Sequence, residues 1–344
     1  MNTPSHILVI RLSALGDVAM TVPVLRVLTH TYPELKLTVL SRRQFEPLFA
    51  DLPNVQFLEA DVQGRHKGFF GLLKLAKEIK GLSINGVADL HQVIRSKILS
   101  WNLSLTGVPI ASLNKGRAEK KKLTHAKGLG LELLKSTHQR YADVFEALGL
   151  AIDLSVPTST ARKPLSSRLL TFVGNEPKKC IGIAPFAAYA SKMYPLELMK
   201  EVIAHLDGLQ AYRILLFGGG QEEIDQLTSW EHAFESVKNV AGALTFAEEL
   251  DLISNLDVMV AMDSANGHLA AMYAVPVITL WGVTHPYAGF TPFQQPEEYQ
   301  IMADRNKFPL IPTSVYGNKY PPSYENVMAS IPSDVVIKKV LSII

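Results

Sequence analysis

Short apolar runs alternate along this chain with longer stretches in which apolar residues recur every three or four positions. A continuous apolar run is typical of a parallel strand buried on both faces, and the longer period is typical of an amphipathic helix. In the first half, apolar runs predict strands at 7–10, 37–40, 55–58 and 87–90. The longer period predicts helices at 18–32, 69–79, 93–105 and 138–148, the first of them bent or late to start because it contains Pro23.

The periodicity is lost between residues 153 and 179 and then resumes. Apolar runs predict strands at 181–185, 214–217, 256–260 and 275–280, and helical periods fall at 195–206, from about 221, at 246–253 and at 332–344. Thr245 and Glu248 fit a capping box at the third of these helices, whereas residues 292–322, rich in Pro and aromatics, are expected to be irregular. Strands and helices in alternation predict two domains, each an open, mostly parallel α/β sheet.

The domain boundaries follow from this pattern. We expect a Rossmann-like domain over 1–155, a linker over 156–178 that contains Pro157, Pro164 and Pro177, a second Rossmann-like domain over 179–330 and a C-terminal helix over 331–344.

Composition narrows the class of protein. The 344 residues carry a formal net charge of only +2, which gives no argument for a nucleic-acid partner. Cys180 is the single cysteine, which fits a reducing compartment. The chain starts without a basic segment followed by a long apolar run, so a cytoplasmic location is expected.

Ligands of open α/β sheets bind beyond the carboxyl ends of the strands, so the loops that follow the predicted strands are the candidate sites. Asp17 is the acidic residue of the first such loop. A carboxylate there suits a general base for a hydroxyl, but helix N-caps are common and an N-cap aspartate is the stronger interpretation from spacing alone.

The corresponding loops of the second half offer a lysine and a glycine turn. The ammonium of Lys192 would neutralise a diphosphate, or it is an ordinary surface lysine. Gly218-Gly219-Gly220 allows close approach of a ligand or simply makes a tight turn, and it lacks P-loop spacing. Glu222 or Glu223 would bond a ribose hydroxyl or complement the helix dipole.

The stretch 261–271 combines small residues with Asp263 and His268 between a predicted strand and a helix. Free N–H groups at a helix start favour binding of an anion. One Asp and one His are too few ligands for a metal site, so no metal is expected. A buried structural His268 is the alternative. Basic residues at 115–122, with Arg65, Arg95, Arg117 and Arg140, would meet an anionic acceptor, although a solvated charged face is the default for most of them.

Four segments together resemble glycosyltransferase family 9, the lipopolysaccharide heptosyltransferases and their relatives. These segments are 7–17 (ILVIRLSALGD), 89–96 (DLHQVIRS), 192–195 (KMYP), and Asp263-Ser264 with His268. The chain departs from the family pattern at Ala265, where glycine is usual and appears instead at Gly267, and at Ala187 and Ala188, where hydroxyl side chains are frequent.

The resemblance implies a GT-B fold, with two facing Rossmann-like domains and an interdomain cleft, and inversion at the anomeric carbon. It implies that Asp17 is the general base and that Lys192 lies at the donor phosphate and sugar. It places a donor site at Asp263, Ser264, Ala265, Gly267 and His268, with Ala187 and Ala188 in the loop before the lysine. The glycine turn adds Gly219, Gly220 and Glu222 as donor-binding candidates. The acceptor candidates are Arg11, Ser13, Gly16, Arg65, Arg95, Arg117 and Arg140.

The expected function is transfer of a sugar, with heptose as the first guess, from a nucleotide-diphosphate donor such as ADP-heptose to a hydroxyl of a lipopolysaccharide core or related anionic glycolipid. No cofactor is expected. A lipid-linked acceptor implies peripheral contact with the cytoplasmic face of the inner membrane, for which the basic cluster at 115–122 is the candidate. Two alternatives stay open: a sugar-nucleotide epimerase or hydrolase on the same scaffold, and a non-catalytic relative that binds a nucleotide or glycan.

Overall fold

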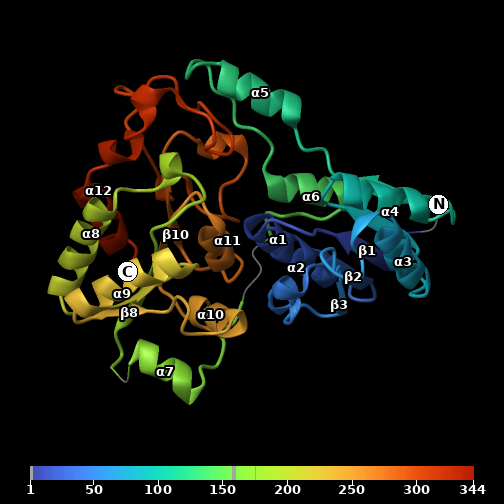
Figure 1. Cartoon of the computed structure of the whole chain (residues 1–344), viewed down its shortest axis with the longest axis horizontal. Helices are drawn as coiled ribbons and strands as arrows, with labels where there is room; N and C mark the ends of the chain where they lie inside the picture. The colour runs from blue at the N-terminus through green and yellow to red at the C-terminus, as the bar shows by residue number, and fades with distance from the viewer. Residues whose placement is uncertain (1–2, 157–159, 175) are drawn as a thin grey trace. The chain divides into compact units, whose positions relative to one another are not determined.

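The computed structural model describes residues 3–156, 160–174 and 176–344 and divides the chain into two compact units (Figure 1). The N-terminal unit is formed by Met1–Lys115 with Thr137–Thr158, and the C-terminal unit by Gly116–Ser136 with Ser159–Ile344. Within the predicted linker, residues 157–159, including Pro157, and residue 175 lie outside the described residues. Residues 116–136 therefore belong to the C-terminal unit, although the sequence pattern groups them with the first domain.

The N-terminal unit contains a parallel five-stranded sheet in the order β3-β2-β1-β4-β5. Its central strand pairs on both sides, with Ile7 opposite Leu37 on one neighbour and opposite Gly86 on the other. Residues 7–10 of that strand are completely buried, as their continuous apolar run predicts. The strands are β1 (His6–Ile10), β2 (Lys36–Ser41), β3 (Val55–Glu59), β4 (Gly86–Asp89) and β5 (Ile110–Ser112).

The helices of this unit cover both faces of its sheet. One face carries α3 (Gly68–Lys80) and α4 (Ile94–Ser104), whose leucines pack with Leu8, Ile10 and Val87. The others are α1 (Leu15–Ala19), α2 (Thr21–Thr31), the 3-10 helix η1 (Arg43–Phe49) and α6 (Thr137–Glu146). Pro23 is the third residue of α2, where a missing N–H removes no helical hydrogen bond, so the expected late start is confirmed.

The C-terminal unit contains a parallel six-stranded sheet in the order β11-β10-β9-β6-β7-β8. Its strands are β6 (Lys179–Ala184), β7 (Tyr212–Leu216), β8 (Val237–Asn239), β9 (Val258–Met262), β10 (Val277–Trp281) and β11 (Gln300–Met302). Strands β5, β8 and β11 have three residues each, which is too short to produce a recognisable period, and they were not predicted.

The α-helices of this unit are α5 (Arg117–His125), α7 (Ser167–Val173), α8 (Leu196–Gly208), α9 (Gln221–Ala233), α10 (Phe246–Ile253), α11 (Ala265–Ala271) and α12 (Ser333–Leu341). Its 3-10 helices are η2 (Ala190–Lys192), η3 (Pro286–Ala288), η4 (Glu297–Tyr299), η5 (Pro322–Tyr324) and η6 (Val327–Ser330). The predicted capping box of α10 is confirmed, since Thr245 N donates to Glu248 at 2.8 Å and Glu248 N donates to Thr245 Oγ1 at 3.3 Å.

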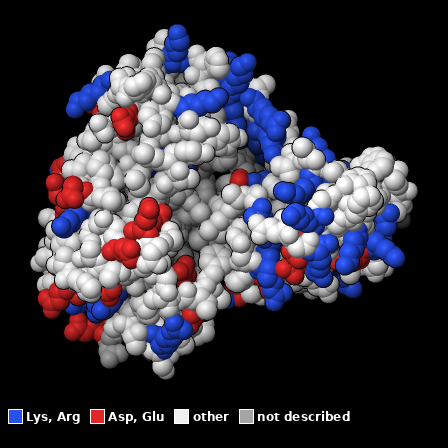
Figure 2. All heavy atoms as spheres, viewed as in Figure 1, with Lys and Arg blue, Asp and Glu red and all other residues white. Residues whose placement is uncertain are grey.

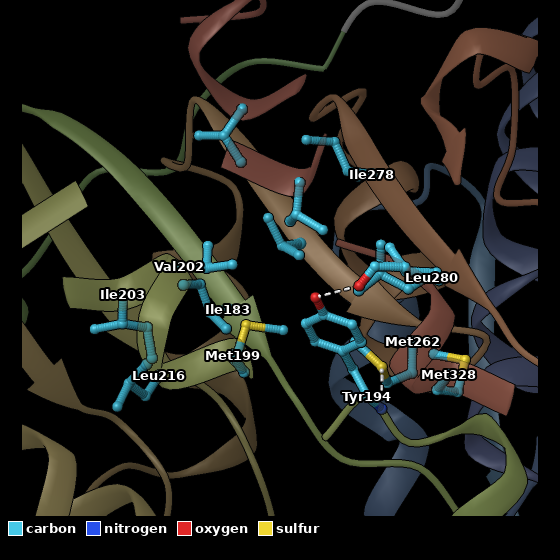
Figure 3. Close-up of a cluster of buried hydrophobic side chains, with 14 of the residues drawn as sticks. Ile183, Tyr194, Met199, Val202, Ile203, Leu216, Met262, Ile278, Leu280 and Met328 are labelled. Carbon is cyan, nitrogen blue, oxygen red and sulfur yellow. Dashed lines mark hydrogen bonds between the residues drawn. The ribbon is translucent and has the colours of Figure 1, made fainter. Parts of the chain in front are cut away.

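A buried tyrosine joins the loop after β6 to the core of the C-terminal unit (Figure 3). Tyr194 is fully buried, its hydroxyl donates to the carbonyl oxygen of Ile331 at 2.8 Å, and its backbone N–H lies 3.3 Å from the sulfur of Met262. Helix α12 packs on α8 through Val336 and Val340, both completely buried. The C-terminal helix is therefore an integral part of this unit.

No helix of the described residues is both long and apolar enough to cross a membrane.

Candidate active site

An arginine and an aspartate meet just beyond β1 in the N-terminal unit. Arg11 is 5% exposed, and its Nη2 lies 2.6 Å from Oδ2 of Asp17, while its Nη1 donates to the carbonyl oxygen of Leu90 at 2.6 Å. The side chain of Asp17 is 32% exposed, so the carboxylate is oriented by a buried cation and still reaches solvent. A substrate hydroxyl can therefore approach it.

The N-cap interpretation of Asp17 does not describe its position. Helix α1 has Ala14 as its N-cap, and Asp17 is the third helical residue, whose Oδ2 accepts from Ala14 N at 3.4 Å as the N3 residue of a capping box. The hydroxyl of Tyr141 donates to the backbone carbonyl of Asp17 at 3.3 Å, and burial raises the pKa of that hydroxyl. The carboxylate thus makes a capping contact at 3.4 Å and a shorter contact to Arg11 at 2.6 Å, and the shorter contact dominates its direction.

A histidine not selected from the sequence completes this edge of the sheet. His91 follows β4, is 7% exposed, and its Nε2 lies 3.4 Å from Oγ of Ser13. Burial, and then the charge of Arg11, lower the pKa of His91 to about 4, so the imidazole is neutral at ordinary pH. The turn that holds it is built by the buried Asp89, which accepts from the N–H groups of His91 and Gln92 at 2.9 Å.

The acceptor candidates of the N-terminal unit differ in accessibility. Gly16 is partly exposed inside α1, between the ion-paired Arg11 and Asp17. Arg65 and Arg95 are exposed in the segments after β3 and β4, and Arg65 lies 3.6 Å from Glu59. Arg140 is 5% exposed and its Nη1 lies 3.4 Å from the carbonyl oxygen of Asn114, which favours a structural role. Arg117 is exposed at the start of α5, in the other unit.

An ion pair also marks the carboxyl edge of the C-terminal sheet. Nζ of Lys192, after β6, lies 3.0 Å from Oδ2 of Asp263, after the neighbouring β9, and the side chains are 12% and 9% exposed. Lys192 is therefore held in place and is no ordinary surface lysine.

Two glycines let other loops close around the lysine. A Cβ on Gly317 would lie 2.4 Å from Cδ of Lys192, and this glycine has a φ of +88°. A Cβ on Gly282 would lie 2.1 Å from the carbonyl oxygen of Ser191, whose hydroxyl donates to the carbonyl of Gly317 at 2.5 Å. The position of Lys192 thus depends on residues far along the chain.

The stretch 261–271 forms the end of β9 and α11, as the sequence predicts. Ser264 is the N-cap of α11, yet its Oγ is buried and has no hydrogen-bond partner among the described residues. His268 is 8% exposed, and a Cβ on Gly267 would lie 3.4 Å from Pro292 and from Val277. Ala265 is partly exposed at the first helical position. A buried hydroxyl without a partner is costly, so Ser264 has the capacity to bind a ligand atom.

The glycine turn after β7 is open on one side. A Cβ on Gly219 or Gly220 would meet nothing within 4 Å, and Gly220 has a φ of +88°. Glu223 accepts from the N–H of Gly219 at 2.7 Å, which leaves Glu222 as the exposed acid of the turn. In the loop after β6, Ala188 is exposed and Ala187 packs partly on the core.

The loop after β10, one of the candidate loops, holds two buried polar side chains that were not named as site residues from the sequence. Thr284 is completely buried and His285 is 2% exposed, and Oγ1 of the former and Nε2 of the latter have no hydrogen-bond partner in the described part of the chain. Burial, with Arg305 nearby, lowers the pKa of His285 to about 4.

Two lysines of the basic segment 115–122 have partners within the C-terminal unit. Lys120 is 7% exposed with its Nζ 4.0 Å from the ring centroid of Phe290, and Lys122 lies 3.1 Å from Glu132. The expectation of a solvated face is therefore wrong for Lys120. Among the described residues, no group of three or more His, Cys, Asp or Glu is arranged to hold a metal ion.

Comparison with known proteins identifies the protein family of this chain. The family model of glycosyltransferase family 9 (heptosyltransferase) matches residues 72–316. The chain is 23% identical over 305 residues to the lipopolysaccharide core heptosyltransferase OpsX of Haemophilus influenzae, covering 83% of this chain and 81% of that protein.

Solved structures agree with this match. A family 9 glycosyltransferase from Veillonella parvula has a TM-score of 0.74 at 19% identity, with 98% of this chain and 97% of that chain covered. The ADP-heptose lipopolysaccharide heptosyltransferase II of Escherichia coli has a TM-score of 0.69 at 18% identity, with 98% of each chain covered.

The chain belongs to glycosyltransferase family 9. It is a glycosyltransferase, and its fold is of the GT-B class that the resemblance implies. The matches support the transferase and not the epimerase, hydrolase or non-catalytic alternatives.

Proposed function

We propose that this glycosyltransferase transfers a heptose from ADP-heptose to a hydroxyl of a lipopolysaccharide core acceptor. The sugar and nucleotide are inferred from family membership and from the relatives, which are named as lipopolysaccharide heptosyltransferases. The N-terminal unit would bind the acceptor and the C-terminal unit the donor. The single observation that carries the mechanism is the partly exposed carboxylate of Asp17, held 2.6 Å from Arg11 at the carboxyl edge of its sheet.

In this proposal Asp17 accepts the proton of the acceptor hydroxyl while the hydroxyl oxygen attacks the anomeric carbon. The bond from that carbon to the diphosphate oxygen breaks, and the nucleoside diphosphate leaves with the electron pair from the opposite face. The product is therefore inverted at the anomeric carbon. Arg11 is a positioning residue, because its two terminal nitrogens link Asp17 to Leu90 and so fix the direction of the carboxylate.

The donor residues act on the leaving group. The ammonium of Lys192 would stabilise the charge that develops on the diphosphate, with Asp263 keeping the lysine aligned at 3.0 Å. The partnerless Oγ of Ser264 and the N–H groups at the start of α11 would bond phosphate oxygens. Glu222, exposed beside the open glycine turn, would accept from a ribose hydroxyl.

The departures at Ala187, Ala188 and Ala265 leave methyl groups where the family commonly has hydroxyls or glycine. Backbone N–H groups can still bind a diphosphate at these positions.

We propose a cytoplasmic enzyme with an acceptor on the inner membrane, which brings the N-terminal unit to a lipid surface.

The test is a thermal-shift screen of nucleotide sugars followed by transfer to a soluble, delipidated core oligosaccharide. A ligand that binds only the folded state raises the melting temperature through RT ln(1 + [L]/Kd). We expect ADP-heptose to give the largest shift, and NMR of the product to show the inverted anomer. A larger shift with a UDP- or GDP-sugar, or donor hydrolysis without transfer, would refute the proposal.

A further inference from the structure

Helix α4 is apolar on both sides. Its inner side packs on the sheet through Leu99 and Leu103, as its position in the core requires. The opposite side carries Ile94, Trp101 and Leu105 just past the helix end, which are 77%, 58% and 66% exposed. These three recur at intervals of seven and four, so they share one stripe that points away from the sheet.

The neighbouring helix α3 adds two aromatic rings. Phe69 and Phe70 at its start are 53% and 83% exposed, and their rings meet edge to face with centroids 5.8 Å apart. Helices α3 and α4 pack side by side on the same face of the sheet. Five of the fourteen exposed large apolar side chains in the described chain thus lie on this one pair of helices.

The charges around these side chains are almost all positive. Residues 67–80 and 94–105 carry six exposed cations, which are Lys67, Lys74, Lys77, Lys80, Arg95 and Lys97. The one acid in these segments, Glu78, lies 3.3 Å from the ring of His66. Figure 2 shows Lys and Arg gathered over this part of the N-terminal unit. We call the five apolar side chains and six cations the α3–α4 face.

Segment 116–136 is the competing candidate and is less suited. It exposes Leu129 and Leu133, at 77% and 72%, but Lys120 is buried and Lys122 is paired with Glu132. Its cations are therefore partly engaged, whereas the six cations of the α3–α4 face share their helices with one acid, Glu78.

We propose that the α3–α4 face docks this enzyme on an anionic lipid bilayer. Phe and Trp side chains enter the interfacial region of a bilayer, and lysines around them are attracted to anionic headgroups. An uncharged or basic partner would not use the six cations, whereas the anionic headgroups of a bilayer would. Both helices begin at the carboxyl edge of the sheet, which is the edge at which Asp17 lies. Docking would therefore present that edge to a membrane-anchored acceptor, a step that rests on the proposed function.

The chain contains its own reporter for this contact. Of its three tryptophans, Trp230 and Trp281 are 2% and 1% exposed, and only Trp101 lies on the surface. On addition of vesicles of phosphatidylglycerol and phosphatidylcholine at low salt, we expect the tryptophan emission to shift to shorter wavelength. Lipids brominated on the acyl chains should quench it.

Variants separate the apolar contribution to vesicle binding from the electrostatic one. Phe70→Asp should abolish vesicle flotation, and Lys74→Gln, Lys77→Gln and Lys97→Gln should each weaken partitioning about fivefold, most strongly at low salt. The matched control is Leu129→Ser with Leu133→Ser, equally exposed on the competing segment, which should float like the parent. All these residues are exposed, so melting temperatures should stay close to the parent value.

Three outcomes would overturn the proposal. They are no emission shift and no flotation of the parent, equal loss of flotation in the Leu129 and Leu133 control, or a self-associated parent that Phe70→Asp turns into monomers without any vesicle binding. Transfer to a soluble, delipidated acceptor separates this proposal from the function itself. Phe70→Asp should keep that transfer. A parent protein that transfers to the soluble acceptor but never binds vesicles would refute the docking surface alone.

Discussion

The carboxylate of Asp17 lies 2.6 Å from Nη2 of Arg11, a side chain that is itself 5% exposed. A buried guanidinium thus directs a carboxylate that remains 32% exposed at the end of the central strand. This arrangement suits the general base that we propose, because the carboxylate is held by a buried cation on one side and is open to solvent on the other.

Removing the charge of Asp17 should affect chemistry more than donor binding. Asp17→Asn keeps the shape of the side chain but cannot accept the proton, so turnover should fall by about 10²- to 10⁴-fold. Calorimetric affinity for the nucleoside diphosphate should stay within a few-fold of the parent. Turnover within a few-fold of the parent, in a variant of unchanged melting temperature, would remove Asp17 from the role of base.

Removing the ammonium of Lys192 should affect donor binding and rate together. In Lys192→Ala the charge beside the diphosphate is lost and Asp263 keeps an uncompensated, nearly buried carboxylate, which repels the donor. We expect weaker binding of the nucleoside diphosphate by calorimetry and a lower kcat. Lys200→Ala, at an exposed position of α8, is the matched control and should behave like the parent. Unchanged affinity and rate in Lys192→Ala would exclude it from the site.

A glycine distant in sequence should control the same lysine. Gly317→Ala would place a methyl group 2.4 Å from Cδ of Lys192 at a φ of +88°, so the side chain must move and the backbone is strained. The strain costs on the order of 1–3 kcal/mol, and donor affinity should fall although no charge changes. Gly208→Ala, where a Cβ meets nothing within 4 Å, is the control. Parental donor affinity in Gly317→Ala would show that Lys192 does not depend on this packing.

His91 should make stability depend on pH. Its folded pKa of about 4 lies below the ordinary histidine value of 6.5, so the unfolded chain binds the proton first as the pH falls. The stability due to its neutral form is complete above about pH 6.5 and is lost between about pH 6.5 and 4, amounting to about 3 kcal/mol.

The measurement is urea unfolding of the parent and of His91→Gln at pH 7 and at pH 4.5. Because other groups titrate alike in both proteins, the parent should lose more stability than the variant over this interval. An equal loss in both proteins would show that His91 titrates alike in the folded and unfolded states.

Most of the fold followed from local pattern. The buried runs 7–10 and 181–185 predicted β1 and β6, and the capping box Thr245–Glu248 predicted the start of α10, because these signals lie within a few consecutive residues. The short strands β5, β8 and β11 gave no such signal, since the sheet neighbours, and not their own sequences, make them strands.

The candidate site was predictable in outline only. The order of strands and loops indicated which residues lie at each carboxyl edge, and so Asp17, Lys192 and Asp263 were selected. The role of His91 was not accessible, because the 3.4 Å contact to Ser13 joins residues that are 78 positions apart. Lys120 was misjudged for the same reason, since Phe290 covers it from a distant part of the chain.

The sequence by itself determined the α/β architecture, the family and the residues at the ends of the strands, because these depend on local periodicity and on short motifs. Only the tertiary structure decided that Arg11 contacts Asp17 in addition to the helix start, that Gly317 leaves room for the stem of Lys192, and that the outer side of α4 is apolar and uncovered. Each of these depends on which distant side chains fill the space around a residue, and packing of that kind is set by the whole fold.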